Sequence, residues 1–128
     1  GINCIQSDLF KKIKGKFDLI IFNPPYLPED NLNFEDDINY IGGKEGNEVI
    51  ERFLSQAKRY LNRNGKILLV FSSLTPSMGE IIKKYNFKYK KLSEKRFFFE
   101  KLYVYLIYWT LWHNFGSYNI LTEKVYFI

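Results

Sequence analysis

The side chains best suited to chemistry in this sequence are Asn23, Pro24, Pro25 and Tyr26, which directly follow the apolar run 17–22 (FDLIIF). Each proline lacks an N–H, fixes its own φ and drives the residue before it into an extended conformation, so the turn is stiff. The Asn23 side chain and the Pro24 carbonyl can then offer two acceptors to one planar NH2 group, and Tyr26 can cover its flat face. With both hydrogens held, the nitrogen lone pair points at an electrophile, and positioning supplies most of the catalysis.

A purely structural interpretation of these four residues also stays open, in which the prolines only end a strand. The context favours chemistry. The run 17–22 is rich in β-forming residues and apolar on both faces, as expected of a central parallel strand. Ligands of an open α/β sheet bind just past the carboxyl ends of its strands, which is where the tetrapeptide falls. We therefore favour a functional motif placed at the end of a strand.

The rest of the sequence predicts the α/β elements that would position this motif. The first predicted element is a short strand over 2–6 that ends near Asp8. A helix over 47–61 follows the candidate motif, with Asn47 as its N-cap and Asn64-Gly65 after its end. The remaining elements are a buried strand over 66–71, a helix over 77–85, and strands over 87–92 and 102–108 joined by a hairpin. Residues 27–41 form a long acidic loop, of a length that is usually functional or mobile. This alternation implies a mostly parallel sheet whose last two strands are antiparallel.

Composition bounds the class of protein. The 128 residues are a single-domain length, and 46% hydrophobic residues are enough to build a core. Cys4 is the only cysteine and His113 the only histidine, so a disulfide framework, a metal site and a Ser-His-Asp triad are all poorly supported. We expect an intracellular, cytoplasmic protein without a metal. The amino terminus lacks the pattern of a signal peptide, and the apolar segment 102–112 is too short to span a bilayer, so no membrane contact is expected.

Charge is a weaker guide to partners. The net charge is +5, with acidic residues gathered in the first half of the chain and basic residues in the second. A basic half suits a nucleic acid or an acidic partner. Lysines that solvate exposed helices and strands explain it equally well.

Four segments together resemble the carboxyl-terminal part of a class I methyltransferase that uses S-adenosylmethionine (SAM). More narrowly, they resemble the HemK-type protein-glutamine methyltransferases of the archaeal and eukaryotic branch, which modify the GGQ motif of translation release factors. The segments are SDLF at 7–10, FDLIIFNPPY at 17–26, GGKEG at 42–46 and FFFEKLYVYLI at 97–107. The resemblance covers residues 1–108 and implies a partial, Rossmann-like methyltransferase domain. It leaves 109–128 as an unassigned extension, for which an added strand on an exposed sheet edge and sequence translated beyond the ancestral frame are both open.

The resemblance also implies roles for individual residues. Asp8 would accept a hydrogen bond from the adenine amino group of SAM, with Leu9 beside the ring. Asn23 and the Pro24 carbonyl would bind the glutamine amide, Pro25 would stiffen the slot and Tyr26 would wall it, with Asn23 also facing the cofactor. On spacing alone, Asp8 is equally well a turn-forming residue.

The sequence departs from the family pattern in ways that limit its expected activity. The glycine-rich turn and the acidic residue that the family uses for SAM are absent, and the strands that carry them would lie between the strand ending at Asp8 and the strand ending at Asn23. We expect this chain alone to bind SAM weakly or not at all. The expected partners are a release factor as substrate and a complementing protein subunit. The alternatives are a methyltransferase acting on adenine or guanine amines of a nucleic acid, and a non-catalytic module that pairs with another chain.

Overall fold

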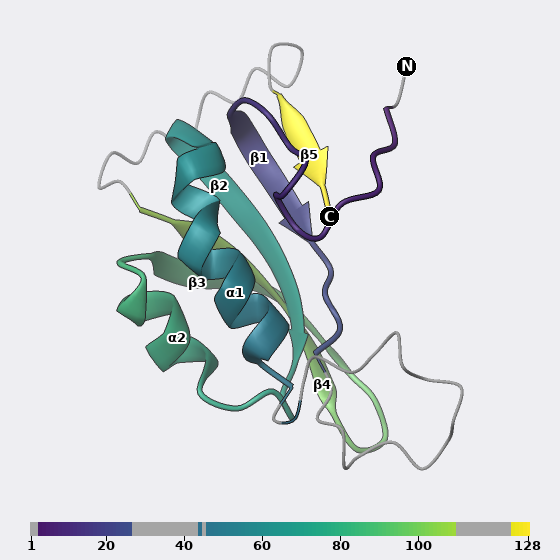
Figure 1. The fold of residues 1–128 in the computed structure, drawn as a ribbon. Helices are drawn as coiled ribbons and strands as arrows, with labels where there is room; N and C mark the ends of the chain where they lie inside the picture. The colour runs from purple at the N-terminus through teal and green to yellow at the C-terminus, as the bar shows by residue number, and fades with distance from the viewer. Residues whose placement is uncertain (1–2, 27–43, 45, 110–123) are drawn as a thin grey trace.

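A computed structural model of the chain describes residues 3–26, 44, 46–109 and 124–128. It contains one five-stranded sheet, in the order β3-β4-β2-β1-β5, with two helices on the same side of it (Figure 1). The elements are β1 (Phe17–Phe22), α1 (Glu48–Ala57), the 3-10 turn η3 (Lys58–Tyr60), β2 (Leu61–Ser72), α2 (Met78–Lys84), β3 (Lys88–Arg96), β4 (Lys101–Tyr108) and β5 (Val125–Phe127). β1 is parallel to β2 and β5, whereas β4 is antiparallel to β2 and β3. The predicted α/β fold and its antiparallel last hairpin are confirmed.

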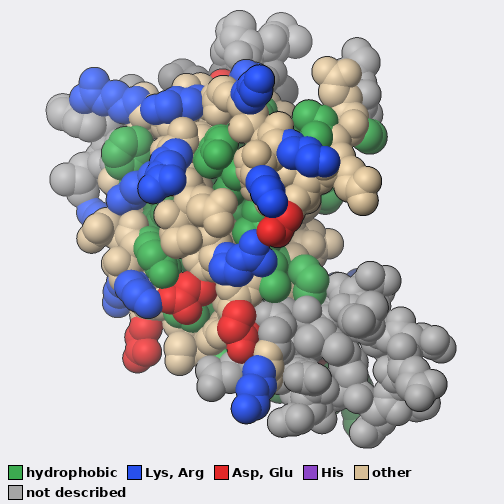
Figure 2. All heavy atoms as spheres, viewed as in Figure 1, with side chains coloured by type: hydrophobic (Ala, Val, Ile, Leu, Met, Phe, Trp, Pro, Cys, Tyr) green, Lys and Arg blue, Asp and Glu red, His purple; other side chains and the backbone are tan. Residues whose placement is uncertain are grey.

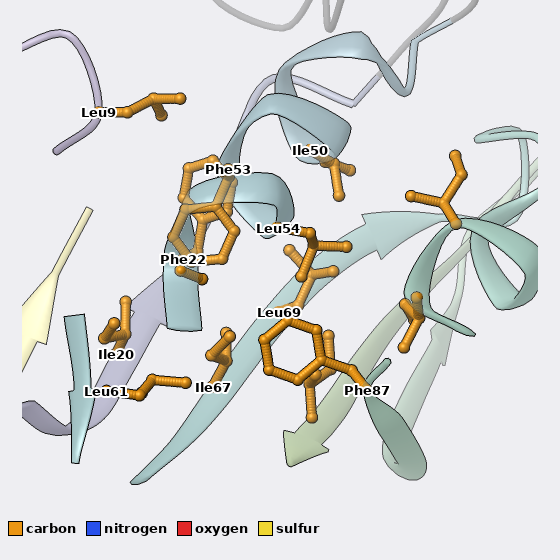
Figure 3. Packing of buried hydrophobic residues seen from close by; sticks show 14 of the residues in the cluster. Leu9, Ile20, Phe22, Ile50, Phe53, Leu54, Leu61, Ile67, Leu69 and Phe87 are labelled. Atoms are coloured by element: carbon orange, nitrogen blue, oxygen red, sulfur yellow. The ribbon is translucent and has the colours of Figure 1, made fainter. Parts of the chain in front are cut away.

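The core lies between α1, α2 and one face of the sheet (Figure 3). The apolar stripe of α1 buries Ile50, Phe53, Leu54 and Ala57, as the helical periodicity predicts. The Phe53 ring stacks on Phe22 of β1, with ring centroids 4.0 Å apart. This stack sets the height of α1 over the carboxyl end of β1, where the candidate motif begins.

The opposite face of the sheet is also apolar but only half-buried. Along β1 and β2, the side chains that alternate with the core residues are Leu19, Ile21, Leu68 and Val70. β1 therefore has apolar side chains on both faces, as predicted, with one face packed against the helices and the other less covered.

The predicted end of the first helix is wrong. Leu61 is already extended (φ −103°, ψ 137°) and pairs with Phe17, so β2 begins five residues earlier than the predicted strand. Asn62 Nδ2 donates to Asp18 Oδ1 at 2.7 Å and holds this early part of β2 against β1. At Gly65 a Cβ would lie 2.9 Å from the Phe17 carbonyl oxygen, so the glycine permits the close approach of two strands instead of ending a helix.

The predicted strand over 2–6 is also wrong, because residues 3–6 have no regular secondary structure and Ile5 is 54% exposed. The edge of β1 away from β2 is taken by β5 (Figure 1). Lys124 N donates to Asp18 Oδ2 at 2.8 Å, Ile128 N donates to the Ile21 carbonyl at 2.8 Å, and the Tyr126 ring stacks 4.9 Å from that of Phe17. The end of the carboxyl-terminal extension is thus an added strand on a sheet edge. Residues 110–123 lie outside the described residues.

A surface network joins the two helices. Lys84 Nζ of α2 donates to Glu51 Oε1 of α1 at 2.6 Å, and the Tyr85 hydroxyl donates to the same oxygen at 3.0 Å. These two hydrogen bonds, that from Lys84 first, hold the pKa of the Glu51 carboxyl below its ordinary value. Ionised Glu51 therefore stabilises the fold at neutral pH, and this contribution is lost as acid protonates the folded carboxyl.

We expect Glu51→Gln to lower the melting temperature slightly at neutral pH. Because the folded pKa of Glu51 is depressed, the difference in melting temperature from the parent chain should be complete above the unfolded pKa and should shrink as the pH falls through the folded pKa. Circular-dichroism melts between about pH 3 and pH 7 measure it. Glu80→Gln on α2 is the matched control, since Glu80 is exposed and its replacement should leave the melting temperature at neutral pH nearly unchanged. A difference in melting temperature between Glu51→Gln and the parent chain that stays the same at every pH would contradict the assignment.

Candidate active site

The motif lies where the sequence predicts it, directly beyond the carboxyl end of β1. β1 ends at Phe22, and the backbone N–H of Asn23 donates to the Ile128 carbonyl at 3.2 Å. The Asn23 side chain is exposed, Pro24 is buried, and Pro25 and Tyr26 are half-buried. Among the residues that the structure describes, none hydrogen-bonds the Asn23 carboxamide. The backbone of Asn23 is therefore held by β5 while its side chain is presented at the surface.

The other end of the tetrapeptide is held by β2 and the turn that follows it. The Thr75 hydroxyl donates to the Tyr26 carbonyl at 2.9 Å and accepts from the Ser72 N–H at 3.3 Å. The Ser72 hydroxyl, which is fully buried, is in turn hydrogen-bonded to the Glu100 carboxylate on the β3–β4 hairpin. Buried polar groups with complete hydrogen bonding fix a local structure closely. This cluster links the motif to two other segments of the chain.

Sequence reasoning missed this cluster. Residues 72–76 (SSLTP) lie between the predicted strand over 66–71 and the predicted helix over 77–85, and nothing in their order shows which carbonyl Thr75 reaches. Asn47 is a related case, because it precedes α1 as predicted but makes no side-chain cap. Its Nδ2 instead donates to the Pro76 carbonyl at 3.1 Å, so it ties the start of α1 to the same turn.

We expect Thr75→Val to destabilise the chain by about 1–3 kcal/mol, because it leaves both the Tyr26 carbonyl and the Ser72 N–H without the Thr75 hydroxyl. Urea unfolding followed by circular dichroism measures the change. Thr75→Ser retains the hydroxyl and is the matched control, with a smaller loss from the missing methyl group. If Thr75→Ser is as unstable as Thr75→Val, the methyl group and not the hydrogen bonds fixes the turn.

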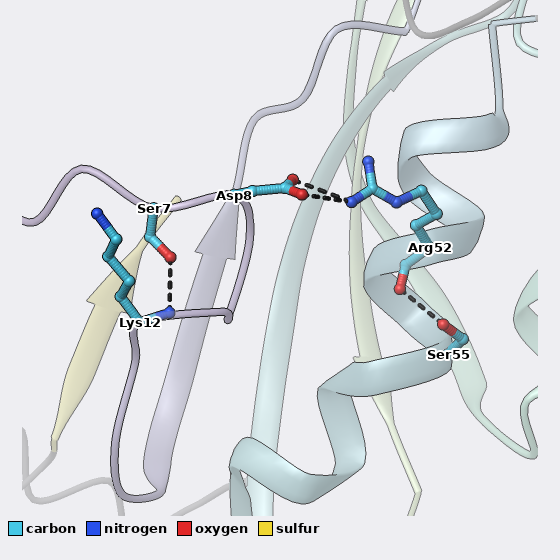
Figure 4. Close-up of polar contacts among 5 residues, drawn as sticks. All are labelled: Ser7, Asp8, Lys12, Arg52 and Ser55. Atoms are coloured by element: carbon cyan, nitrogen blue, oxygen red, sulfur yellow. Dashed lines mark hydrogen bonds and ion pairs between the residues drawn. The ribbon is translucent and has the colours of Figure 1, made fainter.

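Asp8 lies in a turn and presents its carboxylate at the surface. Lys11 N donates to the Asp8 carbonyl at 3.1 Å, and Lys12 N donates to Ser7 Oγ at 2.9 Å. Arg52 of α1 donates from one Nη to both Asp8 oxygens, at 3.0 and 2.9 Å (Figure 4). Both side chains of this ion pair are more than half exposed, so the pair itself contributes little stability. Arg52 was not identified from the sequence, which gives no sign that helix α1 passes Asp8.

Leu9 differs from Asp8 in its surroundings, because it is buried in the core cluster and has a left-handed φ of 50°. The next residue, Phe10, stacks on Phe53 at 5.2 Å, and Phe53 stacks on Phe22. Figures 1 and 4 both place the turn that carries Asp8 near the carboxyl end of β1. The structure thus brings Asp8 and Asn23 to one end of the sheet, although within the described part of the chain no hydrogen bond joins the two residues.

Several predicted features lie outside the described residues, namely the acidic loop over 27–41 and glycines 42 and 43. In the described part of the chain, no helix has the length and apolarity needed to cross a membrane. No group of three or more His, Cys, Asp or Glu side chains suited to a metal ion is found there either. Figure 2 shows Lys and Arg side chains spread over the face that carries the helices, with fewer acidic side chains among them.

Comparison with known proteins identifies the family. Residues 2–99 match the family model "Methyltransferase small domain". A putative protein N5-glutamine methyltransferase of Methanocaldococcus jannaschii is 40% identical over 113 residues, which are 81% of this chain and 55% of that protein. A release factor glutamine methyltransferase of Borreliella burgdorferi is 40% identical over 75 residues, 53% of this chain and 26% of that protein. Methyltransferase HEMK2 of Mus musculus is 38% identical over 72 residues, 54% of this chain and 34% of that protein.

The chain thus spans about half the length of the first of these relatives and less of the other two. Among solved structures, the E. cuniculi Mtq2–Trm112 complex, described as methylating the eRF1 translation termination factor, superposes with a TM-score of 0.67. The match has 24% identity and covers 86% of this chain and 63% of that one, so it supports the fold. With the family model, it confirms the Rossmann-like methyltransferase architecture. This chain belongs to the methyltransferase small domain family, and within that family it resembles the HemK-type glutamine methyltransferases.

Proposed function

We propose that this chain forms part of a SAM-dependent methyltransferase that methylates the side-chain amide nitrogen of glutamine, in the GGQ motif of a translation release factor. The observation that carries the proposal is the exposed carboxamide of Asn23 at the carboxyl end of β1. The backbone N–H of Asn23 donates to the Ile128 carbonyl, and the carbonyl of Tyr26, at the other end of the motif, accepts from the Thr75 hydroxyl. The names of the glutamine methyltransferases that the chain resembles support the choice of substrate.

In this proposal the chain acts mainly by positioning. Asn23 Oδ1 and the Pro24 carbonyl accept one N–H each from the glutamine amide, while the ring of Tyr26 covers the face of the amide. Because the two prolines stiffen this segment, little freedom is lost when substrate binds. SAM, when bound, supplies a methyl group on a positively charged sulfur. Transfer of that group to the amide held by Asn23 and Pro24 would form an N–C bond as the S–C bond breaks, and one amide proton would leave to solvent.

The residues near the motif fit part of a SAM site. Asp8 is exposed, and a carboxylate has about four acceptor positions, of which the Arg52 Nη occupies only one on each oxygen. Asp8 can therefore also accept a hydrogen bond from the adenine amino group, and the buried Leu9 side chain would offer an apolar surface to the adenine ring. Since the glycine-rich SAM turn is not in this sequence, we expect the chain by itself to bind SAM weakly or not at all.

We further propose a complementing protein subunit as a partner and the cytoplasm, where release factors act, as the location. The Mtq2 structure that this chain resembles in fold is a complex with a second protein, Trm112. A subunit of that kind is expected to raise the affinity for SAM in a titration followed by calorimetry.

The function is tested by methyl transfer from labelled SAM to a purified eRF1-type release factor, with the chain alone and with candidate subunits. Label on the GGQ glutamine, located by mass spectrometry of the tryptic peptide and absent when that glutamine is replaced by alanine, supports the proposal. Label on RNA or DNA in place of the protein overturns it. So does the absence of transfer under every combination.

A further inference from the structure

The tip of the β3–β4 hairpin is an exposed aromatic surface. Phe97, Phe98 and Phe99 are 42%, 102% and 73% exposed. We call these three residues the aromatic tip. Isolated exposed apolar residues are common, but three consecutive large rings at a single turn form a patch of the kind that marks an interaction site. Neither the fold nor the proposed methyl transfer uses them.

The aromatic tip is held rigidly at its base. Phe97 N donates to the Glu100 carbonyl at 2.8 Å and closes the turn. On the β2 side, Ser73 N donates to the Lys101 carbonyl at 2.8 Å, and Lys101 N donates to Ser73 Oγ at 2.9 Å. A partner that binds such a turn loses little affinity to ordering it.

The aromatic tip stands beside the glutamine slot. Glu100, which ends the turn, is hydrogen-bonded to Ser72, and Ser72 is joined through Thr75 to the Tyr26 carbonyl. The three links place the turn and the motif at the same end of the sheet, where β1 and β2 have their carboxyl ends (Figure 1). A polypeptide that enters the slot can therefore also reach the aromatic tip.

The charges around the aromatic tip indicate what it would bind. A shallow, open hollow beside the three rings is also lined by Ser73, Arg96, Glu100, Lys101 and Tyr103. Lys95 Nζ lies 5.4 Å from the centre of the Phe97 ring. The one carboxylate in the turn, that of Glu100, is engaged by Ser72. The surface is thus apolar at its centre and positive at its rim, which complements an apolar segment flanked by acidic side chains.

We propose that the aromatic tip is a docking site for the polypeptide substrate, which grips an apolar, acid-flanked segment of the release factor outside the methylated glutamine. The inference rests on the proposed function and adds a second contact to it. Slot residues select the amide, whereas the aromatic tip selects the protein that carries it. Phe is among the aromatic residues enriched in protein interfaces, where a few buried anchor side chains commonly contribute most of the binding energy.

The test measures the affinity of the whole chain, with its subunit if one is required, for an eRF1-type release factor labelled with a fluorophore. The double substitution Phe98→Ser and Phe99→Ser is expected to raise Kd about tenfold or more. Leu92→Ser is the matched control, because Leu92 is 50% exposed on β3 away from the turn, and it should change Kd less than about twofold. Arg96→Glu should also weaken binding, and more so at low salt. Circular-dichroism melts establish that each variant is folded.

A second measurement separates this inference from the proposed function. The double variant should methylate a short peptide that contains only the GGQ motif at the parental rate, and should show a raised KM, with little change in kcat, on the whole release factor. Unchanged KM and Kd would overturn the docking site while leaving the methyltransferase proposal intact. An absence of transfer to both substrates by the parent chain would overturn the methyltransferase proposal itself. If the parent chain dimerises and the double variant is a monomer in light scattering, the aromatic tip is a self-association surface and the inference is wrong.

Discussion

Replacing Asn23 by alanine is expected to reduce methyl transfer at least about a hundredfold, which is the usual effect of removing one well-placed polar group that acts on the reacting centre. In the proposed slot Asn23 supplies one of two acceptors, and losing it leaves the amide free to rotate away from the electrophile. Because the Asn23 side chain is exposed, the free energy of unfolding should change by less than about 0.5 kcal/mol. Initial rates with labelled SAM and a GGQ peptide, beside a urea melt, measure both effects.

Two control variants sharpen this experiment. Asn64→Ala removes an exposed asparagine from the early part of β2, distant in sequence from the motif, and should retain the parental rate. Asn23→Asp keeps an acceptor oxygen at the position and should retain more activity than Asn23→Ala. If Asn23→Ala methylates the peptide as fast as Asn64→Ala does, Asn23 is only the residue that ends β1 and the slot lies elsewhere.

Phe53→Ala is expected to have the largest effect on stability, with a loss of about 3–5 kcal/mol. Phe53 is fully buried and stacks on both Phe22 and Phe10, at 4.0 and 5.2 Å, so its removal leaves a cavity between α1, β1 and the Asp8 turn. A domain of this size has about 5–15 kcal/mol of stability in all, so the variant should lose a large share of its free energy of unfolding. Urea unfolding followed by circular dichroism gives the difference.

The matched control for Phe53→Ala is Ser55→Ala on the same helix. Ser55 is exposed and its hydroxyl donates to the Arg52 carbonyl of its own helix, so this change should stay within about 0.5 kcal/mol of the parent chain. A small effect for Phe53→Ala would mean that α1 does not pack on β1 through this ring.

The parts of the fold that the sequence predicts well are those determined by residues close to one another in the sequence. FDLIIF is apolar on both faces and is followed by Asn23 and two prolines, so β1 and the place of Asn23 follow from local rules. The apolar stripe of α1 follows from the periodicity of the sequence in the same way, whereas the residue at which the helix ends does not. Asn64-Gly65 has the composition of a helix stop, yet Leu61 leaves the helix earlier because it buries its side chain against β1.

Contacts between distant segments could not be predicted in this way. Asp8 and Arg52 are 44 positions apart, and Thr75 and Tyr26 are 49 apart, so their pairing depends on how the sheet is assembled. The failed strand over 2–6 has the same cause. Its alternation is that of a strand, but the edge of β1 is already occupied by β5, and a strand needs a neighbour to satisfy its backbone.

The pairing of β5 with β1 has a consequence for how the chain folds during synthesis. Asp18 and Lys124, which join the two strands, are 106 positions apart, so the ribosome makes β1 long before it makes its second neighbour. Closing so long a loop is slow, and contacts of this range form late in folding. Until then the Leu19 to Ile21 edge has open N–H and C=O groups that can pair with other nascent chains. Co-translational aggregation, if it occurs, should therefore begin at this edge, and a chaperone that acts late on the emerging chain should suppress it.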